Sequence, residues 1–419
     1  MKVAIIGGGL IGVTTAYFMS NAGHDVTVID REAGPGRGTS FANGALITPG
    51  MAEPWNTPGV LRALLASIGK PDAAIRLQVR ALPSMLGWGL LFLRNANLTA
   101  FEQSTAVCRR LALRSIEVLR AIREHTGIEF GHVSNGTLRL FHDAASLDTA
   151  WTAGVRAQRD GLRLRRLLRS EIAAVEPGLA PVAERFAGAI HYESDENGDA
   201  HQFCVALAEY ASRQGVKFHF GTEVSSLQVR GRKIASLSTT RGTLVADRYI
   251  VAAGSYSAPL LRTAGLRLPV YPVKGYSITV SHPAGGRPIG LPIVDDYAHA
   301  VVTPLEGAIR VAGTAEFAGY DVRLDPSRIR MLFQLLKEVL PQTRFDDSDV
   351  RPWCGLRPVS ADGVPIIGAT SIPNLMVNAG HGHLGWTMAA GSAQLLADLM
   401  CDNPPGLEPS LYSPNRFAQ

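Results

Sequence analysis

A glycine-rich segment near the N-terminus has the residue types and the spacing of a nucleotide-binding turn. Gly7, Gly9 and Gly12 form a GxGxxG motif directly after the apolar run from Lys2 to Ile6, and a stretch with helical spacing follows and ends at Gly23. In this motif the first glycine makes a tight turn, the second lets a pyrophosphate approach the backbone, and the third lets the helix pack closely on the strand. The free N–H groups at the helix N-terminus then bind the phosphates.

An acidic residue completes this βαβ opening. Asp30 ends a second predicted strand over residues 25–29, where its carboxylate can accept a hydrogen bond from a ribose hydroxyl. The motif occurs with both NAD and FAD, but the small polar loop from Thr39 to Ala45 favours close approach to a flavin. The residues predicted to contact FAD in this region are Gly7, Gly9, Leu10, Ile11, Gly12, Asp30, Arg31, Thr39, Ser40, Asn43 and Gly44.

A second glycine-rich segment, GHGHLGWT, opens the last predicted helix, over residues 384–400. The N–H groups at that helix start can stabilise negative charge on the edge of a reduced flavin. The further residues predicted to contact FAD are Val224, Ala253, Gly254, Gly380, Gly382, His383, Leu384, Gly385, Trp386 and Thr387. His381 and His383 have no carboxylate or cysteine at metal-ligand spacing, so we predict no metal site.

Arg357, within Gly355-Leu356-Arg357-Pro358, is the candidate for binding a substrate carboxylate. A guanidinium can make a bidentate pair with a carboxylate and so fixes distance and angle together. Tyr276 and Tyr297 are candidate second donors to that carboxylate, and Lys274 is expected near the flavin ring or in a supporting position. The alternatives are a structural arginine that caps a loop and tyrosines that pack in the core.

The composition excludes several classes of protein. Hydrophobic residues make up 46% and charged residues 18% of the chain, which excludes intrinsic disorder. The net charge of +5 is spread along the chain and does not indicate nucleic-acid binding; the one basic run, Arg156 to Arg169, is predicted to be a solvated helix face. The four cysteines form no CxxC pair, so the sequence predicts neither a zinc site nor a disulfide framework.

The order of the predicted elements indicates the architecture. A length of 419 residues suggests two or three domains. Parallel βαβ pieces at both ends enclose a middle with antiparallel character, which predicts an α/β protein with an added antiparallel sheet. We expect a Rossmann-like FAD-binding domain of discontinuous segments, residues 1–50, 195–262 and 350–419, with an inserted mixed-sheet substrate-binding domain, residues 51–194 and 263–349.

The segment from Gly59 to Leu93 leaves two interpretations open. It mixes arginines with leucines and Trp88, so it could lie at the surface of an anionic membrane or cover the core of the inserted domain. Its most apolar part, Ala81 to Leu93, is too short to span a bilayer. With no signal-peptide pattern at the start, we expect a cytoplasmic protein, with peripheral contact at the inner face of the cell membrane as the open alternative.

Several motifs together resemble one family. The opening VAIIGGGLIG, TSFANGALITPGMAEPW, VAAGSYS, VYPVKGYS, GLRPVSADGVPIIG and NAGHGHLGW are similar, in this order, to the D-amino-acid dehydrogenase branch of the DAO superfamily of FAD-dependent amine oxidoreductases. The resemblance implies FAD, a substrate carboxylate bound by Arg357, and hydride transfer from the substrate Cα to flavin N5. It further implies 2-oxo acid and ammonia as products, and a quinone or redox partner subunit, not oxygen, as the electron acceptor.

Two differences from that branch leave the preferred substrate open. Met51 stands where the branch has a tyrosine, and His383 stands where it has a threonine. Oxidation of glycine, sarcosine or a cyclic imino acid such as D-proline or a hydroxy-D-proline is therefore an alternative. A non-catalytic FAD-holding subunit of a redox complex and an NAD-binding protein are further alternatives, and the intact GLRP segment argues against a pure scaffold.

Overall fold

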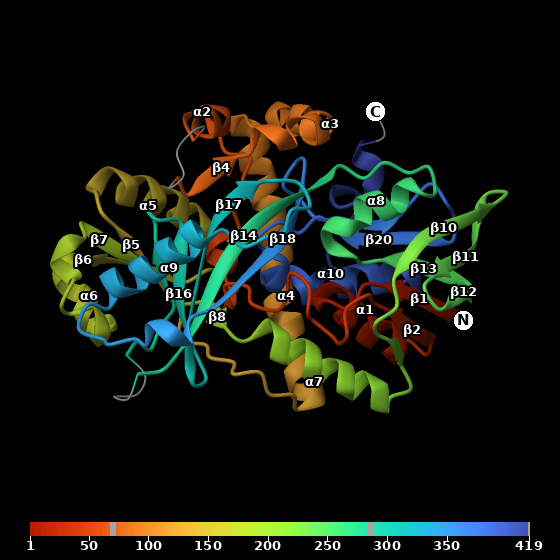
Figure 1. Ribbon diagram of the computed structural model, residues 1–419, viewed down its shortest axis with the longest axis horizontal. Helices are drawn as coiled ribbons and strands as arrows, with labels where there is room; N and C mark the ends of the chain where they lie inside the picture. The colour runs from red at the N-terminus through yellow and green to blue at the C-terminus, as the bar shows by residue number, and fades with distance from the viewer. Residues whose placement is uncertain (68–72, 284–287, 418–419) are drawn as a thin grey trace.

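The computed structural model describes residues 1–67, 73–283 and 288–417. It contains two large β-sheets that lie side by side, with helices on their outer faces and the long helix α4 (Leu98–Thr126) passing between them (Figure 1). The predicted combination of a nucleotide-binding α/β unit with a second, mixed-sheet unit is confirmed.

The first sheet has six strands in the order β19-β20-β13-β1-β2-β9. All neighbouring pairs are parallel except β19 and β20. The strands are β1 (Lys2–Ile6), β2 (Asp25–Ile29), β9 (Lys217–His219), β13 (Arg248–Val251), β19 (Ile366–Ala369) and β20 (Leu375–Ala379). The central strand β1 is a continuous apolar run because a parallel sheet is covered on both faces, and Ala4 and Ile5 are fully buried.

Helices and a small sheet cover the two faces of this first sheet. One face packs against α1 (Leu10–Asn21), α7 (Ala200–Arg213), α10 (Gly385–Met400) and α4. The other face packs against α8 (Ser257–Arg262) and a three-stranded sheet of β10 (Val224–Arg230), β11 (Lys233–Thr239) and β12 (Gly242–Leu244).

The second sheet has nine strands, in the order β18-β14-β17-β16-β15-β5-β7-β6 with β4 beside β17. It is antiparallel except for the pairs β15–β5 and β17–β4. The strands are β4 (Ile75–Leu77), β5 (Thr137–Phe141), β6 (Leu164–Leu168), β7 (Gly188–Tyr192), β14 (Val270–Ser281), β15 (Ile293–Asp295), β16 (Ala300–Leu305), β17 (Ala308–Phe317) and β18 (Arg351–Ser360). Helices α6 (Arg169–Val175) and α9 (Pro326–Val339) cover one of its faces.

Three further helices and a short ribbon complete the fold. Helices α2 (Val60–Ala66) and α3 (Leu82–Arg94) lie beyond β4 and β17, and α5 (Ala144–Gln158) lies beside β5 and β7 (Figure 1). The ribbon pairs β3 (Leu46–Ile47) with β8 (Glu196–Asn197). Within the described ranges, no helix is both long enough and apolar enough to cross a bilayer.

The structure differs from three expectations. Strand β18 pairs along its length with β14, so residues 351–360 belong to the second sheet and not to the FAD-binding unit. Helix α4, expected in the substrate-binding unit, buries Cys108 and Leu111 in the core of the first sheet. The basic run is only partly helical: α5 ends at Gln158, and β6 is an edge strand that buries Leu164 and Leu167 between exposed arginines.

Candidate active site

A cavity of about 1250 Å³ extends between the two sheets. At one end it is lined by the turn between β1 and α1, and at the other end by β5, β14, β15, β17 and β18. The loop between β2 and β3 and the start of α10 line its middle. The cavity therefore joins the predicted nucleotide-binding motif to the predicted substrate-binding arginine.

The glycines of the first motif form a cradle that larger residues would close. Gly7 has a φ of 115°, and a Cβ there would lie 2.4 Å from the carbonyl oxygen of Ala252. A Cβ on Gly12 would lie 1.7 Å from the carbonyl oxygen of Gly7, so Gly12 serves the packing of α1 and does not line the cavity. Helix α1 has no acidic residue in its first turn, and its N-cap is Gly9, which provides no side chain. This arrangement fits the diphosphate of FAD.

Asp30 lies at the nucleotide end, where its two carboxylate oxygens accept hydrogen bonds from the backbone N–H groups of Gly8 and Glu32. Burial raises the pKa of its carboxyl above the ordinary value. The guanidinium of Arg31 stacks 3.8 Å from the ring centre of Tyr256. The predicted residues Val224, Ala253 and Gly254 line the same end of the cavity. Each carboxylate oxygen keeps a second lone pair, so Asp30 can still accept from a ribose hydroxyl.

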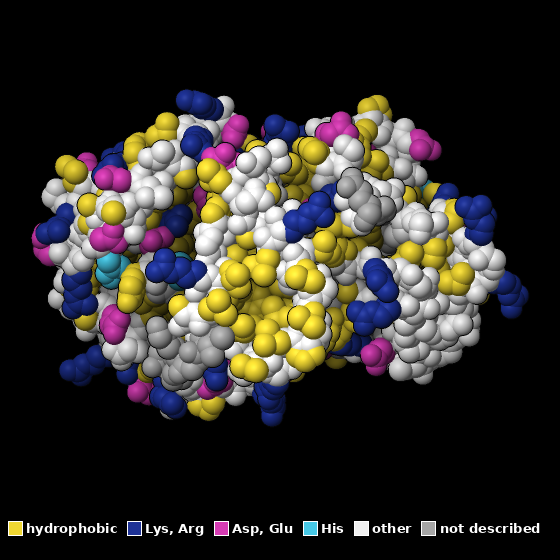
Figure 2. Space-filling view, turned by 90° about the horizontal axis from the view of Figure 1, so that it is seen from above, with side chains coloured by type: hydrophobic (Ala, Val, Ile, Leu, Met, Phe, Trp, Pro, Cys, Tyr) yellow, Lys and Arg dark blue, Asp and Glu magenta, His cyan; other side chains and the backbone are white. Residues whose placement is uncertain are grey.

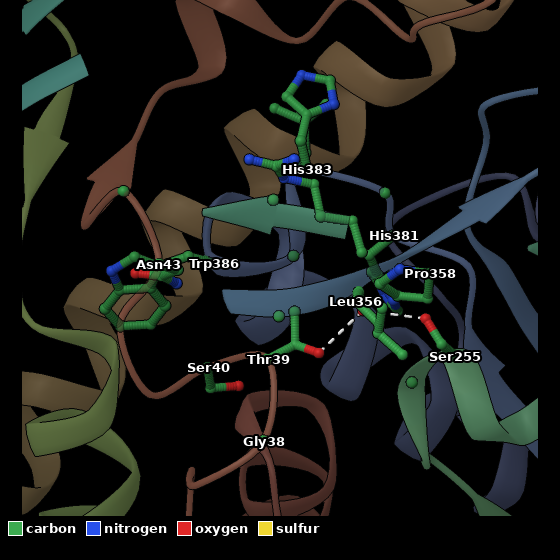
Figure 3. A pocket seen from close by; sticks show the side chains of 18 of the residues that line it. Gly38, Thr39, Ser40, Asn43, Ser255, Leu356, Pro358, His381, His383 and Trp386 are labelled. Atoms are coloured by element: carbon green, nitrogen blue, oxygen red, sulfur yellow. Dashed lines mark hydrogen bonds between the residues drawn. The ribbon is translucent and has the colours of Figure 1, made fainter. Parts of the chain in front are cut away.

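The small polar loop is fixed to the second sheet. Thr39 Oγ1 and Ser255 Oγ each donate to the Leu356 carbonyl at 2.9 Å, as the dashed lines in Figure 3 show. Ser40 Oγ accepts from the N–H of Leu10 at 3.2 Å, and Asn43 Oδ1 accepts from the N–H of Ala45 at 2.9 Å. These side chains line the cavity, but each already has a partner in the protein, so they shape the loop as well as facing the cofactor.

The start of α10 borders the middle of the cavity. Its N-cap, Leu384, provides no capping side chain, and the first turn carries no acidic residue. Six of the predicted residues line the cavity here, namely Gly382, His383, Leu384, Gly385, Trp386 and Thr387. Gly380 does not; it has a φ of 81° and packs against Ser360. Figure 3 shows His383 projecting from this segment, with Asn43 and Trp386 on one side of the view and Pro358 on the other.

Arg357 reaches across three neighbouring strands. From β18 its guanidinium passes over Gly275 on β14, where a Cβ would lie 2.3 Å from Arg357 Cζ. It then donates to the Thr314 carbonyl on β17 at 2.7 Å. The surrounding protein lowers its pKa to about 10, so it stays charged at neutral pH. Among the described residues no carboxylate lies within 4.0 Å of it, and its open surface lines the cavity.

Two aromatic rings position this charge. Trp55 lies with its ring centre 5.2 Å from Arg357 Cζ and stacks on His383 at 5.0 Å with an interplanar angle of 11°. Burial by surrounding protein and the charge of Arg357 lower the pKa of His383 to about 3. His383 is therefore neutral and adds no second positive charge beside Arg357.

Strained backbone is concentrated around this cavity. Ala45, His299 and Thr314 have positive φ angles of 57°, 49° and 60°, and all three line the cavity. Such conformations cost about 1–3 kcal/mol each and persist where the surrounding structure holds them. Thr314, one of these strained residues, is also the residue whose carbonyl accepts the hydrogen bond from Arg357.

None of the three remaining candidates, Tyr276, Lys274 and Tyr297, offers a free donor to the cavity. Tyr276 lines the cavity, but its hydroxyl donates to Glu316 Oε2 at 2.7 Å. Lys274 is buried, donates to the Arg323 carbonyl at 2.7 Å and lies 3.6 Å from Glu316, so it supports the sheet. Tyr297 is 81% exposed and lies outside the cavity, so its prediction as a site residue is wrong; its loop turns the ring toward His142 and solvent.

Sequence reasoning missed several residues that line the substrate end, among them Glu53, Trp55, Arg139 and Thr314. Glu53 and Trp55 lie in the AEPW segment. The signal available was a charged and an aromatic residue two positions apart, in the segment that follows β3. Arg139 and Thr314 carried no signal, because nothing local marks the side of a strand that faces a cavity.

Comparisons with known proteins agree with this geometry. Residues 2–399 match the family described as FAD dependent oxidoreductase. The whole chain is 41% identical to a D-amino acid dehydrogenase of Paramagnetospirillum magneticum and covers 99% of it. It is 39% identical to a D-amino acid dehydrogenase of Bradyrhizobium diazoefficiens, again over the whole chain and 99% of the relative.

Solved structures share the fold. Glycine oxidase from Geobacillus kaustophilus superimposes with a TM-score of 0.78 at 23% identity, over 99% of this chain and 98% of that one. L-proline dehydrogenase from P. horikoshii superimposes with a TM-score of 0.77 at 20% identity, over 100% of this chain and 97% of that one. These two proteins act on different substrates, so the likeness shows the architecture alone.

Proposed function

The chain belongs to the FAD dependent oxidoreductase family, and on that premise we propose that it is a D-amino acid dehydrogenase. Its substrate is then a D-amino acid, and its products are the 2-oxo acid and ammonia. Relatives of nearly the same length that carry this name support the proposal. The observation that carries it is the guanidinium of Arg357, which lines the cavity without a carboxylate partner among the described residues.

Arg357 would fix the α-carboxylate of the substrate. A charge held among protein atoms is costly unless it is paired, so the site favours an anion at this position. The Thr314 carbonyl and Trp55 restrict the guanidinium, and a planar guanidinium can bind both carboxylate oxygens at once. The orientation of the substrate Cα then follows from the orientation of Arg357.

FAD is the cofactor of the family and, when bound, takes up the hydride that leaves the substrate Cα. The N-terminus of α1 would hold its diphosphate, Asp30 its ribose, and the loop from Thr39 to Ala45 with the start of α10 its ring. The protein positions the substrate and excludes water; its neutral His383 offers a hydrogen bond without adding charge.

Turnover with a panel of substrates tests this function. Purified holoenzyme should reduce a redox dye with D-amino acids and release the matching 2-oxo acid, while producing little peroxide in air. Faster turnover of glycine, sarcosine or a cyclic imino acid such as D-proline than of any D-amino acid with a primary amine would assign it to the alternative class of glycine, sarcosine or cyclic imino-acid oxidation. Failure to turn over any of these would contradict the proposed activity and favour a non-catalytic FAD-holding subunit.

A quinone acceptor would require access to lipid, and the surface formed by α2 and α3 is suited to contact with a bilayer. Helices α2 and α3 with the segment between them expose Leu61, Leu65, Val79, Leu86, Leu90 and Leu91. Arg62, Arg80 and Arg94 are exposed in the same segment. Figure 2, which looks onto this side, shows hydrophobic side chains gathered around a hollow with basic side chains near them. An apolar face with basic residues fits the surface of an anionic bilayer.

Co-sedimentation with anionic vesicles at low salt tests this peripheral contact. The informative variant is Leu86→Ser with Leu90→Ser, because both side chains are exposed, whereas Trp88 is buried and its indole donates to the Val359 carbonyl at 2.9 Å. The control is Leu168→Ser, an equally exposed leucine on the far edge of the second sheet. Protein that stays in the supernatant, or binding that survives the double substitution, contradicts the membrane contact.

A further inference from the structure

The substrate end of the cavity continues past Arg357 to a second charged group. Met51, Glu53, Pro54 and Trp55 line the cavity, whereas Ala52 is buried in the core of the first sheet. Arg139 from β5 and Asp296 from the loop after β15 line the same end. The cavity thus has a positive group on β18 and a mixed charged cluster on the opposite edge.

The charges of this cluster do not balance. Arg139 donates to Asp296 Oδ1 from Nη2 at 2.6 Å and from Nε at 3.0 Å. Asp295, behind it, accepts from His142 at 3.0 Å and from the N–H of Ala298 at 2.9 Å. The guanidinium of Arg139 is thereby committed to Asp296.

Glu53 lines the same cavity as this pair. No ion pair within 4.0 Å joins Glu53 to any residue that the structure describes. Glu53, Asp296 and Arg139 all line the cavity, so two carboxylates and one guanidinium give this part of the lining a net negative charge.

We propose that Glu53 forms a subsite for a positively charged substrate side chain, so that the enzyme prefers D-amino acids with a basic side chain, such as D-lysine. This inference rests on the proposed function. Trp55 contacts Arg357 and lies two residues after Glu53, so their Cα atoms are at most about 7 Å apart. Glu53 therefore lies on the segment that borders the carboxylate-binding arginine, in the cavity that both residues line.

The alternative role for Glu53 is to bind the α-ammonium group that every amino acid carries. The two roles differ in one measurable respect. Loss of an α-ammonium partner would weaken all substrates alike, whereas loss of a side-chain partner would weaken only basic substrates. D-norleucine provides the comparison because it has the four-carbon side chain of D-lysine without the terminal ammonium group.

The experiment measures kcat/KM of the holoenzyme for D-lysine and D-norleucine, in the wild type, in Glu53→Gln and in Glu306→Gln. Glu306 is an exposed glutamate between β16 and β17 and controls for the change in net charge. We expect Glu53→Gln to lower kcat/KM for D-lysine about tenfold and to leave D-norleucine within about twofold, with normal flavin content. Glu306→Gln should change neither value.

The other outcomes are equally decisive. An equal fall for both substrates would assign Glu53 to the α-ammonium group, and no fall for D-lysine would remove Glu53 from substrate binding; either result overturns the subsite while the proposed function stands. A wild type that oxidises neither amino acid, nor any other of the panel, would instead contradict the proposed function itself.

Discussion

The two ends of the cavity are built in opposite ways. At the nucleotide end, backbone groups and glycines of one contiguous motif, Gly7 to Gly12, create the surface. At the substrate end, side chains from strands far apart in sequence create it, with Arg357 on β18 resting on Thr314 of β17. The nucleotide end is therefore formed by residues that are close together in the sequence, whereas the substrate end forms only when the strands of the second sheet have paired.

The ends also differ in how their charges are compensated. Asp30 at the nucleotide end accepts two backbone hydrogen bonds, so the protein supports its charge before any ligand arrives. Arg357 has one carbonyl partner, and Glu53 has no ion-pair partner within 4.0 Å among the residues that the structure describes. Charges that the protein leaves incompletely paired are the ones that a substrate can pair, which is why the substrate end decides specificity.

A glycine-to-alanine substitution should therefore act differently at the two ends. The largest effect is expected for Gly7→Ala, at the nucleotide end. The new Cβ would lie 2.4 Å from a backbone carbonyl oxygen at a φ of 115°, and a backbone clash cannot relax as a flexible side chain can. We expect loss of bound FAD and a destabilisation of at least about 3 kcal/mol, measured by flavin content and thermal unfolding.

Gly23→Ala is the matched control for that prediction. Gly23 also has a positive φ, 79°, but a Cβ there meets nothing within 4 Å. Gly23→Ala should lower the free energy of unfolding by only about 1 kcal/mol through backbone strain, and the variant should keep its bound FAD. Equal effects of the two substitutions would mean that the cradle at Gly7 has no special role.

Arg357→Lys should give the next largest effect, in activity and not in folding. Lysine keeps the charge but loses the planar fork, so the substrate Cα would be misplaced, and a misplacement of about 1 Å can cost roughly 100-fold in rate. We expect kcat/KM to fall about 100-fold while flavin absorbance and the melting temperature stay near the wild-type values. Wild-type kcat/KM in this variant would show that the carboxylate binds elsewhere.

These contrasts explain which features the sequence could predict. The turn at Gly7, the acid at Asp30 and the start of α10 follow from local pattern, because each works through its own backbone. Trp55 could not be placed, because its approach to Arg357 depends on the pairing of β14 with β18 and on a loop without regular structure. Tyr297 was predicted from residue type alone, and its side chain faces solvent.

Asp30→Ala tests whether the nucleotide end depends on side chains at all. Loss of a ribose partner should weaken FAD retention by about 1–3 kcal/mol, since the backbone cradle remains. The measurement is the dissociation constant of FAD by fluorescence, with thermal unfolding of the apoprotein as the control for fold. Unchanged retention would make Asp30 a residue that only orders the turn through Gly8 and Glu32.

Gly275→Ala is the substrate-end counterpart of Gly7→Ala. Its Cβ would lie 2.3 Å from Arg357 Cζ, the far end of a flexible side chain, so the guanidinium can move and the fold should tolerate the change. We expect normal FAD content and stability, with KM raised about tenfold because the carboxylate partner is displaced. A Gly275→Ala enzyme that loses its FAD would erase the distinction between the two ends.

A buried carboxyl, that of Asp195, lies behind the middle of the cavity. Asp195 accepts a hydrogen bond from Thr48 Oγ1 at 2.6 Å, and the N–H of Thr48 donates to Thr387 Oγ1 at 3.0 Å. Thr48 and Thr387 both line the cavity, whereas Asp195 is fully enclosed behind them. Burial raises the pKa of Asp195 to about 7, so this carboxyl titrates near neutral pH.

The smallest predicted effect is a pH-dependent one at this residue. An unfolded aspartate has a pKa near 3.9, so between about pH 4 and pH 7 the folded protein holds a proton that the unfolded chain has lost. Stability contributed by Asp195 is therefore fully present below about pH 4 and is lost progressively as the pH rises from about 4 through about 7. Asn at this position keeps an acceptor for Thr48 and cannot ionise. We expect Asp195→Asn to match the wild-type melting temperature at about pH 4 and to exceed it by a few degrees at pH 8. A difference that does not change with pH would mean that Asp195 does not titrate in this range.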